Sequence, residues 1–239
     1  MPRFFTDDIN ENTARISGDD AVHIGRSLRM RLGDEITLCS GGMEYLCKIR
    51  SISDIEVLCD VISSQKTKAE PSVGLTLFQA VPKQDKLEFI VQKAVELGVC
   101  KIVPVLTERC ISRPDGKSFE KKRARLQKIA EGAAKQSGRG IIPQVTDIIS
   151  IEEAAASLNR CDVALICYEK GGERLCRERF DGKKTVGLMI GCEGGFSESE
   201  VKLCEENGAL PIWLGERILR CETAPLAAVS IIMHLTGNM

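Results

Sequence analysis

Apolar and polar side chains alternate along residues 36–62 with the two-residue period of β-strands. Turn signals interrupt the alternation at Ser40-Gly41-Gly42 and at Ser53-Asp54. The apolar positions of the three runs are Ile36 and Leu38; Tyr45, Cys47 and Ile49; and Ile55, Val57, Cys59 and Val61. Short alternating runs joined by tight turns predict a small antiparallel unit in the first part of the chain.

The polar segment at residues 63–72 contains no large apolar side chain, and the rhythm of the sequence changes after it. A polar stretch between two differently patterned regions is typical of a domain boundary. We therefore expect a small N-terminal domain over residues 1–70 and a larger domain over residues 72–239.

From residue 75 onward, short apolar runs alternate with segments of helical period. Helices are predicted from Asp85, with Glu88 at the capping-box spacing, over residues 119–136, and from Thr223. The runs with the length and composition of buried strands are residues 75–81, 102–106, 163–168, 186–190 and 210–214. Strands that alternate with helices predict a parallel α/β fold for this domain.

Charge is balanced over the whole chain but not locally. There are 33 Lys and Arg against 34 Asp and Glu, so net charge neither indicates nor excludes a nucleic-acid partner. Residues 113–139, however, contain nine basic and three acidic residues. Such a run is either a solvated helix face or a contact for RNA phosphates, and Arg26, Arg29 and Arg31 in the small domain favour the second interpretation.

Cysteine and histidine usage argues against disulfides and metal sites. The 11 cysteines are an odd number, none is at Cys-x-x-Cys spacing, and there are only 2 histidines. Residues 1–5 do not resemble a signal peptide, and the longest apolar stretch, residues 227–235, is too short to cross a bilayer. We expect a soluble, cytoplasmic protein with reduced thiols, no metal and no membrane contact.

A glycine loop, Ile190-Gly191-Cys192-Glu193-Gly194-Gly195, stands between a predicted strand and a helix whose start is marked by Ser197 and Glu200. In open α/β folds such a loop lies at the ligand-binding edge of the sheet. Glu193 disfavours a polyphosphate ligand and suits ribose hydroxyls, an amino group or a sulfonium, all of which S-adenosylmethionine offers. A tight turn without a ligand is the alternative.

A second loop, residues 214–225, also follows a predicted strand and precedes a predicted helix. The charged residues of this loop are Glu216, Arg217, Arg220 and Glu222, arranged around Ile218 and Leu219. A loop that only connects a strand to a helix would seldom contain this combination of charged and apolar residues. The two arginines either face a ligand or form ion pairs with the two glutamates across the loop.

Both loops resemble those of the RsmE-type 16S rRNA uracil-N3 methyltransferases. The resemblance rests on Ile190-Gly191-x-Glu193-Gly194-Gly195-Phe196-Ser197 and on Leu214-Gly215-x-Arg217-Ile218-Leu219-Arg220-x-Glu222-Thr223-Ala224. Further similar segments are residues 3–5, 23–29, 33–34, 83–88, 93–99 and 136–139. Two positions depart from the family pattern, because Cys192 stands where proline is usual and Lys135 stands where an acidic residue is common.

The resemblance implies a SPOUT-type α/β domain whose C-terminal chain forms a trefoil knot around S-adenosylmethionine. It also implies an N-terminal PUA-like β-barrel that binds RNA, and a homodimer that methylates N3 of one uridine in 16S ribosomal RNA, free or in the assembled small ribosomal subunit. Two alternatives stay open: a knotted methyltransferase with another target nucleotide, and a noncatalytic RNA-binding ribosome-assembly factor.

Candidate site residues follow from the resemblance and from the chemistry. Because uracil N3 must lose its proton while negative charge spreads onto the carbonyl oxygens, a base and a cation are needed. The catalytic candidates are Arg220, Arg139, Glu193 and Glu222. The cofactor-binding candidates are Ile190, Gly191, Glu193, Gly194, Gly195, Leu214, Gly215, Ile218, Leu219 and Thr223. The RNA-binding candidates are Arg26, Arg29, Arg31, Lys83, Lys86, Arg113, Lys122 and Arg139.

Overall fold

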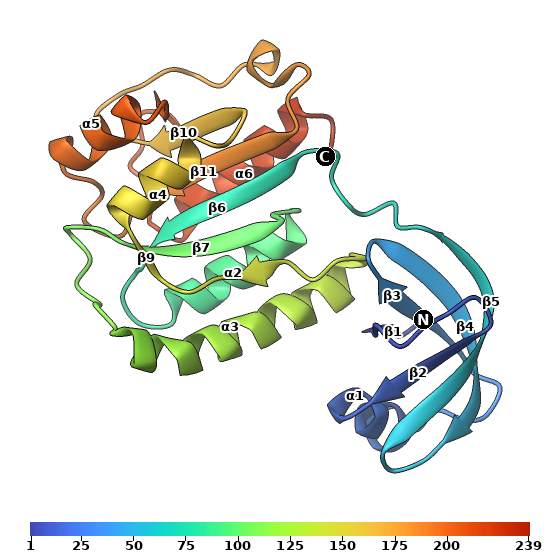
Figure 1. Cartoon of the computed structure of the whole chain (residues 1–239). Helices are drawn as coiled ribbons and strands as arrows, with labels where there is room; N and C mark the ends of the chain where they lie inside the picture. The colour runs from blue at the N-terminus through green and yellow to red at the C-terminus, as the bar shows by residue number, and fades with distance from the viewer. The chain divides into compact units, whose positions relative to one another are not determined.

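The computed structural model describes residues 1–115 and 118–239 in full and, for residues 116 and 117, the backbone only. The chain forms two compact units (Figure 1). The first unit comprises Met1–Glu70 together with Ala134–Ile141, and the second comprises Pro71–Ala133 together with Ile142–Met239.

A curled five-stranded sheet in the order β1-β3-β4-β5-β2 forms the first unit (Figure 1). The element bounds are β1 Arg3–Phe5, β2 Thr13–Ser17, α1 Asp19–Val22, a π-helix at His23–Ser27, β3 Glu35–Ser40, β4 Met43–Ile52 and β5 Glu56–Lys66. Strands β3, β4 and β5 pair antiparallel, as the alternation predicts, and β1 joins β3 in parallel. The alternating side chains that fill its core include Ile36, Leu38, Cys47, Ile49, Val57 and Cys59.

The end of β5 corrects the expected extent of the polar segment between the domains. Residues 63–66 continue β5 and pair with residues 43–46, although their own side chains are polar and exposed. A strand ladder is made by backbone groups, so an exposed strand end forms without an apolar pattern. The polar segment is thus partly strand, and the division between the units lies between Glu70 and Pro71.

Residues 134–141 join the first unit from far along the chain. They are the end of helix α3 (Gly116–Ser137) and the loop that follows it. Lys135 ion-pairs with Asp20 at 2.8 Å, and its ammonium lies 5.5 Å from the centre of the Phe4 ring. Lys135, which departs from the family pattern, therefore connects the end of α3 to the N-terminal part of the first unit through its ion pair with Asp20.

The second unit is an α/β domain in which every strand pair is parallel. The sheet order is β12-β10-β11-β6-β7-β8, with β9 also beside β7. The strand bounds are β6 Gly74–Ala80, β7 Lys101–Leu106, β8 Gln144–Val145, β9 Ile149–Ser150, β10 Val163–Cys167, β11 Thr185–Ile190 and β12 Leu210–Ile212. The helices beside α3 are α2 Lys86–Glu96, α4 Ile151–Leu158, a 3-10 helix at Arg177–Phe180, α5 Glu198–Glu206 and α6 Thr223–Leu235. The predicted parallel α/β architecture is confirmed.

Helix starts follow the local sequence signals, with one exception. Ser197 and Glu200 form the predicted capping box at the start of α5. Asp85 is the N-cap residue of α2, but its side chain accepts no capping hydrogen bond. The carboxylate of Glu88 instead forms an ion pair with Arg125 of α3, at 2.8 Å. The predicted capping box of α2 is therefore wrong, because the side chain of Glu88 does not bond to the start of its own helix.

Candidate ligand-binding site

A cavity of about 530 Å³ opens at the carboxyl ends of β10, β11 and β12. Its walls are residues 167–169 after β10, residues 190–196 after β11 and residues 212–221 after β12, with Lys86 and Ala224. These loops emerge side by side because β10 lies between β11 and β12 in a parallel sheet. The volume and the position at the carboxyl edge are those of small-molecule sites in α/β folds.

Backbone geometry explains the glycines of the loop after β11. Gly195 has φ +63°, and a Cβ on it would lie 2.9 Å from Glu169 Oε1. A Cβ on Gly191 would lie 3.1 Å from the Cα of Gly195, and one on Gly194 would lie 2.9 Å from Cβ of Arg109. Side chains at these positions would therefore clash within the unit, and their absence lets the loop turn tightly along the cavity wall.

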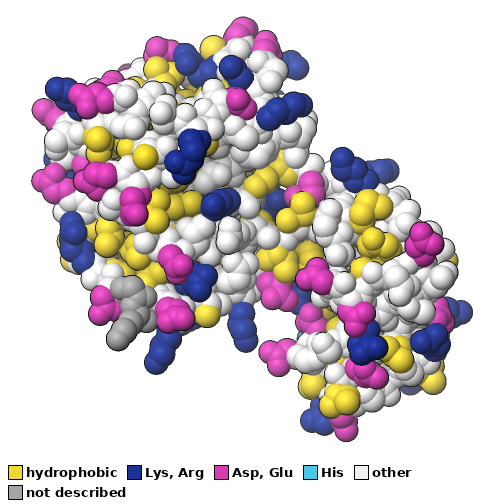
Figure 2. All heavy atoms as spheres, viewed as in Figure 1, with side chains coloured by type: hydrophobic (Ala, Val, Ile, Leu, Met, Phe, Trp, Pro, Cys, Tyr) yellow, Lys and Arg dark blue, Asp and Glu magenta, His cyan; other side chains and the backbone are white. Residues whose placement is uncertain are grey.

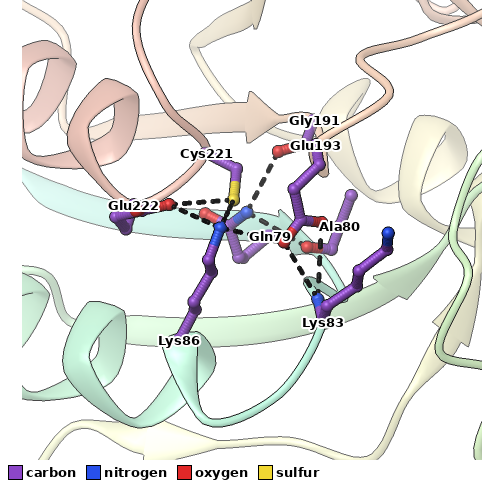
Figure 3. Close-up of polar contacts among 8 residues, drawn as sticks. All are labelled: Gln79, Ala80, Lys83, Lys86, Gly191, Glu193, Cys221 and Glu222. Atoms are coloured by element: carbon purple, nitrogen blue, oxygen red, sulfur yellow. Dashed lines mark hydrogen bonds and ion pairs between the residues drawn. The ribbon is translucent and has the colours of Figure 1, made fainter.

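Lys86, the first residue of α2, joins the two loops that carry the sequence motifs (Figure 3). Its Nζ lies 3.1 Å from Oε1 of Glu193 and 3.2 Å from Oε2 of Glu222. The Cys221 Sγ is 3.8 Å from the same nitrogen. Glu193 also accepts the backbone N–H of Lys83, at 3.2 Å. We call Lys86, Glu193 and Glu222 the lysine cluster.

The lysine cluster keeps all three of its groups charged at neutral pH. Hydrogen bonds to Glu193 and Glu222 raise the pKa of Lys86. Burial by itself would raise the pKa of Glu193 and of Glu222, but hydrogen bonds, including those from Lys86, outweigh it and hold both pKa values below their ordinary range. A carboxylate with a lowered pKa is a hydrogen-bond acceptor and a weak proton acceptor.

Gln79 fastens the start of the glycine loop to β6 (Figure 3). Its side chain is fully buried, and its Nε2 donates to the carbonyl oxygen of Gly191 at 3.3 Å and to that of Ala80 at 3.1 Å. Within the described residues, its Oε1 has no hydrogen-bond partner. A buried amide in this position orders the loop without depending on a ligand.

Cys192, the departure from the family pattern in the loop, packs against Cys110 and Thr107. The hydroxyl of Thr107 lies 3.1 Å from Sγ of Cys110 and 4.0 Å from Sγ of Cys192. The hydrogen bond between the two thiols lowers the pKa of Cys110 to about 6 and raises the pKa of Cys192. Because Cys192 also lines the cavity, a pair of coupled thiols lies directly behind the ligand wall.

Most of the predicted cofactor residues are brought together. The lining residues that the sequence predicted are Ile190, Gly191, Glu193, Gly194, Gly195, Leu214, Gly215, Ile218 and Leu219. Ile218 is nevertheless 86% exposed, and Thr223 does not line the cavity, its N–H being bonded to the carbonyl of Arg220 in the first turn of α6.

The catalytic candidates are divided between the two units. Arg220 and Glu193 line the cavity, and Glu222 reaches it through Lys86. Arg139 does not: its side chain is 2% exposed in the first unit, where Nη2 lies 2.7 Å from Oε2 of Glu70. The sequence predicted an exposed side chain at Arg139, because it belongs to a basic run. In the structure the side chain is buried and pairs with Glu70, which is far away in the chain.

The loop after β12 resolves the alternative of ion pairs across it. Among the described residues, neither Arg217 nor Arg220 is within ion-pair distance of a carboxylate, whereas Glu222 is paired with Lys86. Both arginines line the cavity. The described residues therefore show no ion pair across the loop, and the two exposed arginines stay candidates for contact with a ligand.

The RNA-binding candidates lie in varied surroundings. Arg29, Arg31 and Lys83 have exposed side chains, and Arg26 forms an exposed ion pair with Asp54. Lys122 donates to the carbonyl oxygen of Gln84. Arg113 donates to the carbonyl oxygens of Thr107 and Glu108. On the face shown in Figure 2, basic and acidic side chains are interspersed on each unit. Lys86 belongs to the cavity wall.

Sequence reasoning missed Tyr168, Glu169 and Trp213, which line the cavity. Tyr168 is the last residue of a predicted strand and Glu169 follows it, and Trp213, the one tryptophan of the chain, follows β12. Their positions after strands of a parallel sheet are the signal that could have indicated them.

No helix among the fully described residues is long and apolar enough to span a membrane. Over the same residues, no group of three or more His, Cys, Asp or Glu side chains is placed to hold a metal ion.

The fold and the cavity define a ligand-binding α/β domain joined to a small β domain. Each of the two domains matches a known family model. Residues 69–233 match a family model described as an RNA methyltransferase domain. Residues 16–62 match one described as an RNA methyltransferase PUA domain. The chain belongs to the RNA methyltransferase family.

Named relatives cover nearly the whole chain. The Ribosomal RNA small subunit methyltransferase E of Bacillus subtilis is 36% identical over 94% of this chain and 91% of its own length. The Neisseria gonorrhoeae protein of the same name, solved with S-adenosyl methionine, has a TM-score of 0.88 and 33% identity over 98% of both chains. A Legionella pneumophila methyltransferase solved with its cofactor SAM has a TM-score of 0.87 and 30% identity, covering 97% of this chain and 96% of its own.

Proposed function

We propose that this chain is an S-adenosylmethionine-dependent methyltransferase of small-subunit ribosomal RNA. The observation that carries the proposal is the cavity between the two motif loops, in a chain whose relatives over nearly its full length are named for this activity. The structures of two similar proteins contain the cofactor. The noncatalytic alternative gains no support, because both loops keep their charged and glycine positions.

The residues of the cavity suit this cofactor. Glu169, Glu193 and Glu216 offer acceptors for ribose hydroxyls and an amino group, and Tyr168 and Trp213 offer aromatic surface beside apolar Ile190 and Leu219. The glycines at 194 and 195 let the loop pass close to Arg109 and, in the cavity wall, to Glu169. When bound, the cofactor supplies an electrophilic methyl group on a sulfonium leaving group.

The finer proposal is that the methyl acceptor is N3 of a uridine. This nitrogen bears a proton and becomes nucleophilic only as that proton leaves, with charge spreading to the flanking carbonyl oxygens. Our candidate to stabilise that charge is Arg220, which lines the cavity. Glu193 and Glu222 are the available acceptors, although Lys86 weakens both as bases.

We further propose a division of labour between a PUA-like RNA-binding domain over residues 1–70 and a SPOUT-type methyltransferase domain over residues 72–239, with the C-terminal chain in a trefoil knot and with two chains per active enzyme. The division into two domains is supported by the match of the two parts to separate family models, and the knot and the dimer are proposed from the family resemblance alone. Light scattering of the purified protein tests the dimer, since a monomer at micromolar concentration would contradict it.

A methylation assay tests the proposed function. Small ribosomal subunits from a strain without this activity are incubated with the protein and labelled S-adenosylmethionine, and the nucleosides are separated by mass spectrometry. We expect N3-methyluridine at one position. Another methylated nucleoside would favour a different target, and cofactor binding without any transfer would favour an assembly factor.

Replacement of Glu193 by glutamine tests its role as base. General-base assistance contributes about 10² to 10⁴ in rate, so turnover is expected to fall by at least about 10² if Glu193 accepts the proton. Single-turnover measurement with saturating cofactor separates this loss from weaker binding. Near-full turnover would exclude Glu193 and transfer the role to Glu222 or to solvent.

A further inference from the structure

Three segments that are far apart in sequence meet at the ammonium group of Lys86. The lysine begins α2, Glu193 lies in the loop after β11, and Glu222 ends the loop before α6. The side chains of the three residues are 27%, 29% and 22% exposed, so the contacts are partly shielded from water. Figure 3 shows all three side chains directed toward one another.

The pairing is more than an ordinary surface salt bridge. An isolated exposed ion pair contributes little, because water screens it and both side chains are otherwise free. Here one cation serves two carboxylates within 3.2 Å of the same nitrogen: Glu193 lines the cavity, and Glu222 lies in the chain between the lining residues Cys221 and Ala224. Without Lys86, two like charges would face each other, which would drive the loops apart or make one carboxylate take up a proton.

We propose that Lys86 is a positioning residue of the cofactor site: through Glu193 and Glu222 it holds the glycine loop and the loop before α6 in the arrangement that receives the cofactor. The inference rests on the proposed function. It moves Lys86 from the set of RNA contacts to the methyl-donor site. The lysine contributes to cofactor binding by pre-organising both loops, which lowers the cost of ordering them on binding.

This role has a pH signature. The lowered pKa values of Glu193 and Glu222 keep both carboxylates charged above about pH 5, and the raised pKa of Lys86 keeps the ammonium charged below about pH 10, so the lysine cluster itself adds no pH dependence to wild-type affinity between those limits. In Lys86→Met, which keeps side-chain length, the two carboxylates lose their shared cation. Protonation of one then relieves the repulsion, so the defect is large at high pH and shrinks as pH falls.

The test is calorimetric titration of the full chain with S-adenosylmethionine between about pH 6 and about pH 9, with quenching of Trp213 fluorescence as a second readout. We expect Lys86→Met to weaken binding by about tenfold at the upper end of this range. Lys86→Arg restores most of the affinity. The double variant Lys86→Met with Glu222→Gln removes the repulsion and recovers a flat pH profile.

The matched control is Lys93→Met on the same helix, which removes a lysine paired with Glu96 at 2.9 Å and outside the cavity wall. It is expected to bind the cofactor as wild type does. Equal or tighter binding by Lys86→Met, or a loss that neither low pH nor the second substitution relieves, would overturn the positioning role. Absence of binding by the wild type would instead refute the proposed function itself.

Discussion

Cys192 occupies a place in the glycine loop where similar sequences usually have proline, and its neighbours give the thiol a defined partner. Proline would fix the backbone angle of the loop and could not take part in hydrogen bonding through its side chain. The cysteine instead shares the Thr107 hydroxyl with Cys110. The glycine loop therefore lacks the fixed backbone angle of a proline but has a polar contact from Cys192 to Thr107, in the segment after β7.

The coupling of the two thiols predicts a change in reactivity. Cys192→Ala removes the donor that stabilises the Cys110 thiolate, so the pKa of Cys110 should rise from about 6 toward that of an ordinary thiol. The measurement is the pH dependence of iodoacetamide labelling at Cys110, followed by peptide mass spectrometry, with exposed Cys176 as internal reference. Superimposable profiles for wild type and variant would show that the thiols are not coupled.

Residue roles were predictable from the sequence only where the local pattern determines the surroundings. The glycines and Glu193 stand directly after a buried strand, so their place at the sheet edge followed from the strand alone. Lys86 and Arg139 were both predicted as RNA contacts, which implies exposed side chains. Their true surroundings depend on carboxylates more than 60 positions away in the chain, and no local pattern records such a partner.

At the scale of elements, predictions were again correct where a local pattern determines the structure and wrong where it does not. The buried parallel strands and the helix starts at Ser197 and Thr223 were predictable, because apolar runs and caps act within a few residues. The end of β5 was missed because its side chains are polar and only its backbone pairs. The three residues of β1 are too few for a period to be visible, and the alternation of Ala14 and Ile16 in β2 was missed.

The capping box of α5 predicts a measurable stability effect. Ser197→Ala leaves the N–H of Glu200 without the Oγ acceptor that now lies 3.3 Å away, and we expect the free energy of unfolding to fall by about 1 kcal/mol. Urea unfolding followed by Trp213 fluorescence reports on the second unit. Lys202→Ala, which removes an exposed side chain 3.9 Å from Glu206 on the same helix, is the control, and an equal loss in both variants would mean that the cap is not the cause.

At the scale of the whole molecule, Glu70 closes the first unit around a segment from much later in the chain. Its carboxylate accepts hydrogen bonds from the Arg139 side chain, from Gly140 N–H at 2.9 Å and from Ile141 N–H at 3.1 Å. One nearly buried carboxylate therefore organises the whole 139–141 turn. The membership of residues 134–141 in this unit is a long-range contact, and the sequence contains no local sign of it.

Loss of the Glu70 charge should destabilise the first unit selectively. Glu70→Gln removes one charged partner of the buried Arg139 guanidinium, which is expected to cost about 3 kcal/mol. Hydrogen exchange measured by mass spectrometry should accelerate in β3, β4 and β5. Asp54→Asn, which breaks the exposed pair with Arg26, should leave exchange unchanged; equal protection in Glu70→Gln would contradict the role of the pair.

RNA binding, if the small unit provides it, should depend on salt. Affinity for a 16S ribosomal RNA fragment is expected to fall by at least about tenfold between about 50 and 200 mM salt, because each phosphate contact releases counterions. Arg31→Gln should reduce the slope of log affinity against log salt by about one. Arg160→Gln, on the second unit after α4, is the control, and a flat salt response would contradict phosphate contacts.

The order in which the cavity walls occur along the chain has a consequence for synthesis. Apart from Lys86, the walls lie between residues 167 and 224, and the small unit is incomplete without residues 134–141. A ribosome releases the chain from its N-terminus, so the loop before α6 is the last wall to leave the exit tunnel. The ligand can then stabilise the chain only after residue 224 has left the tunnel, and shorter nascent chains must rely on the sheet and on chaperones for protection.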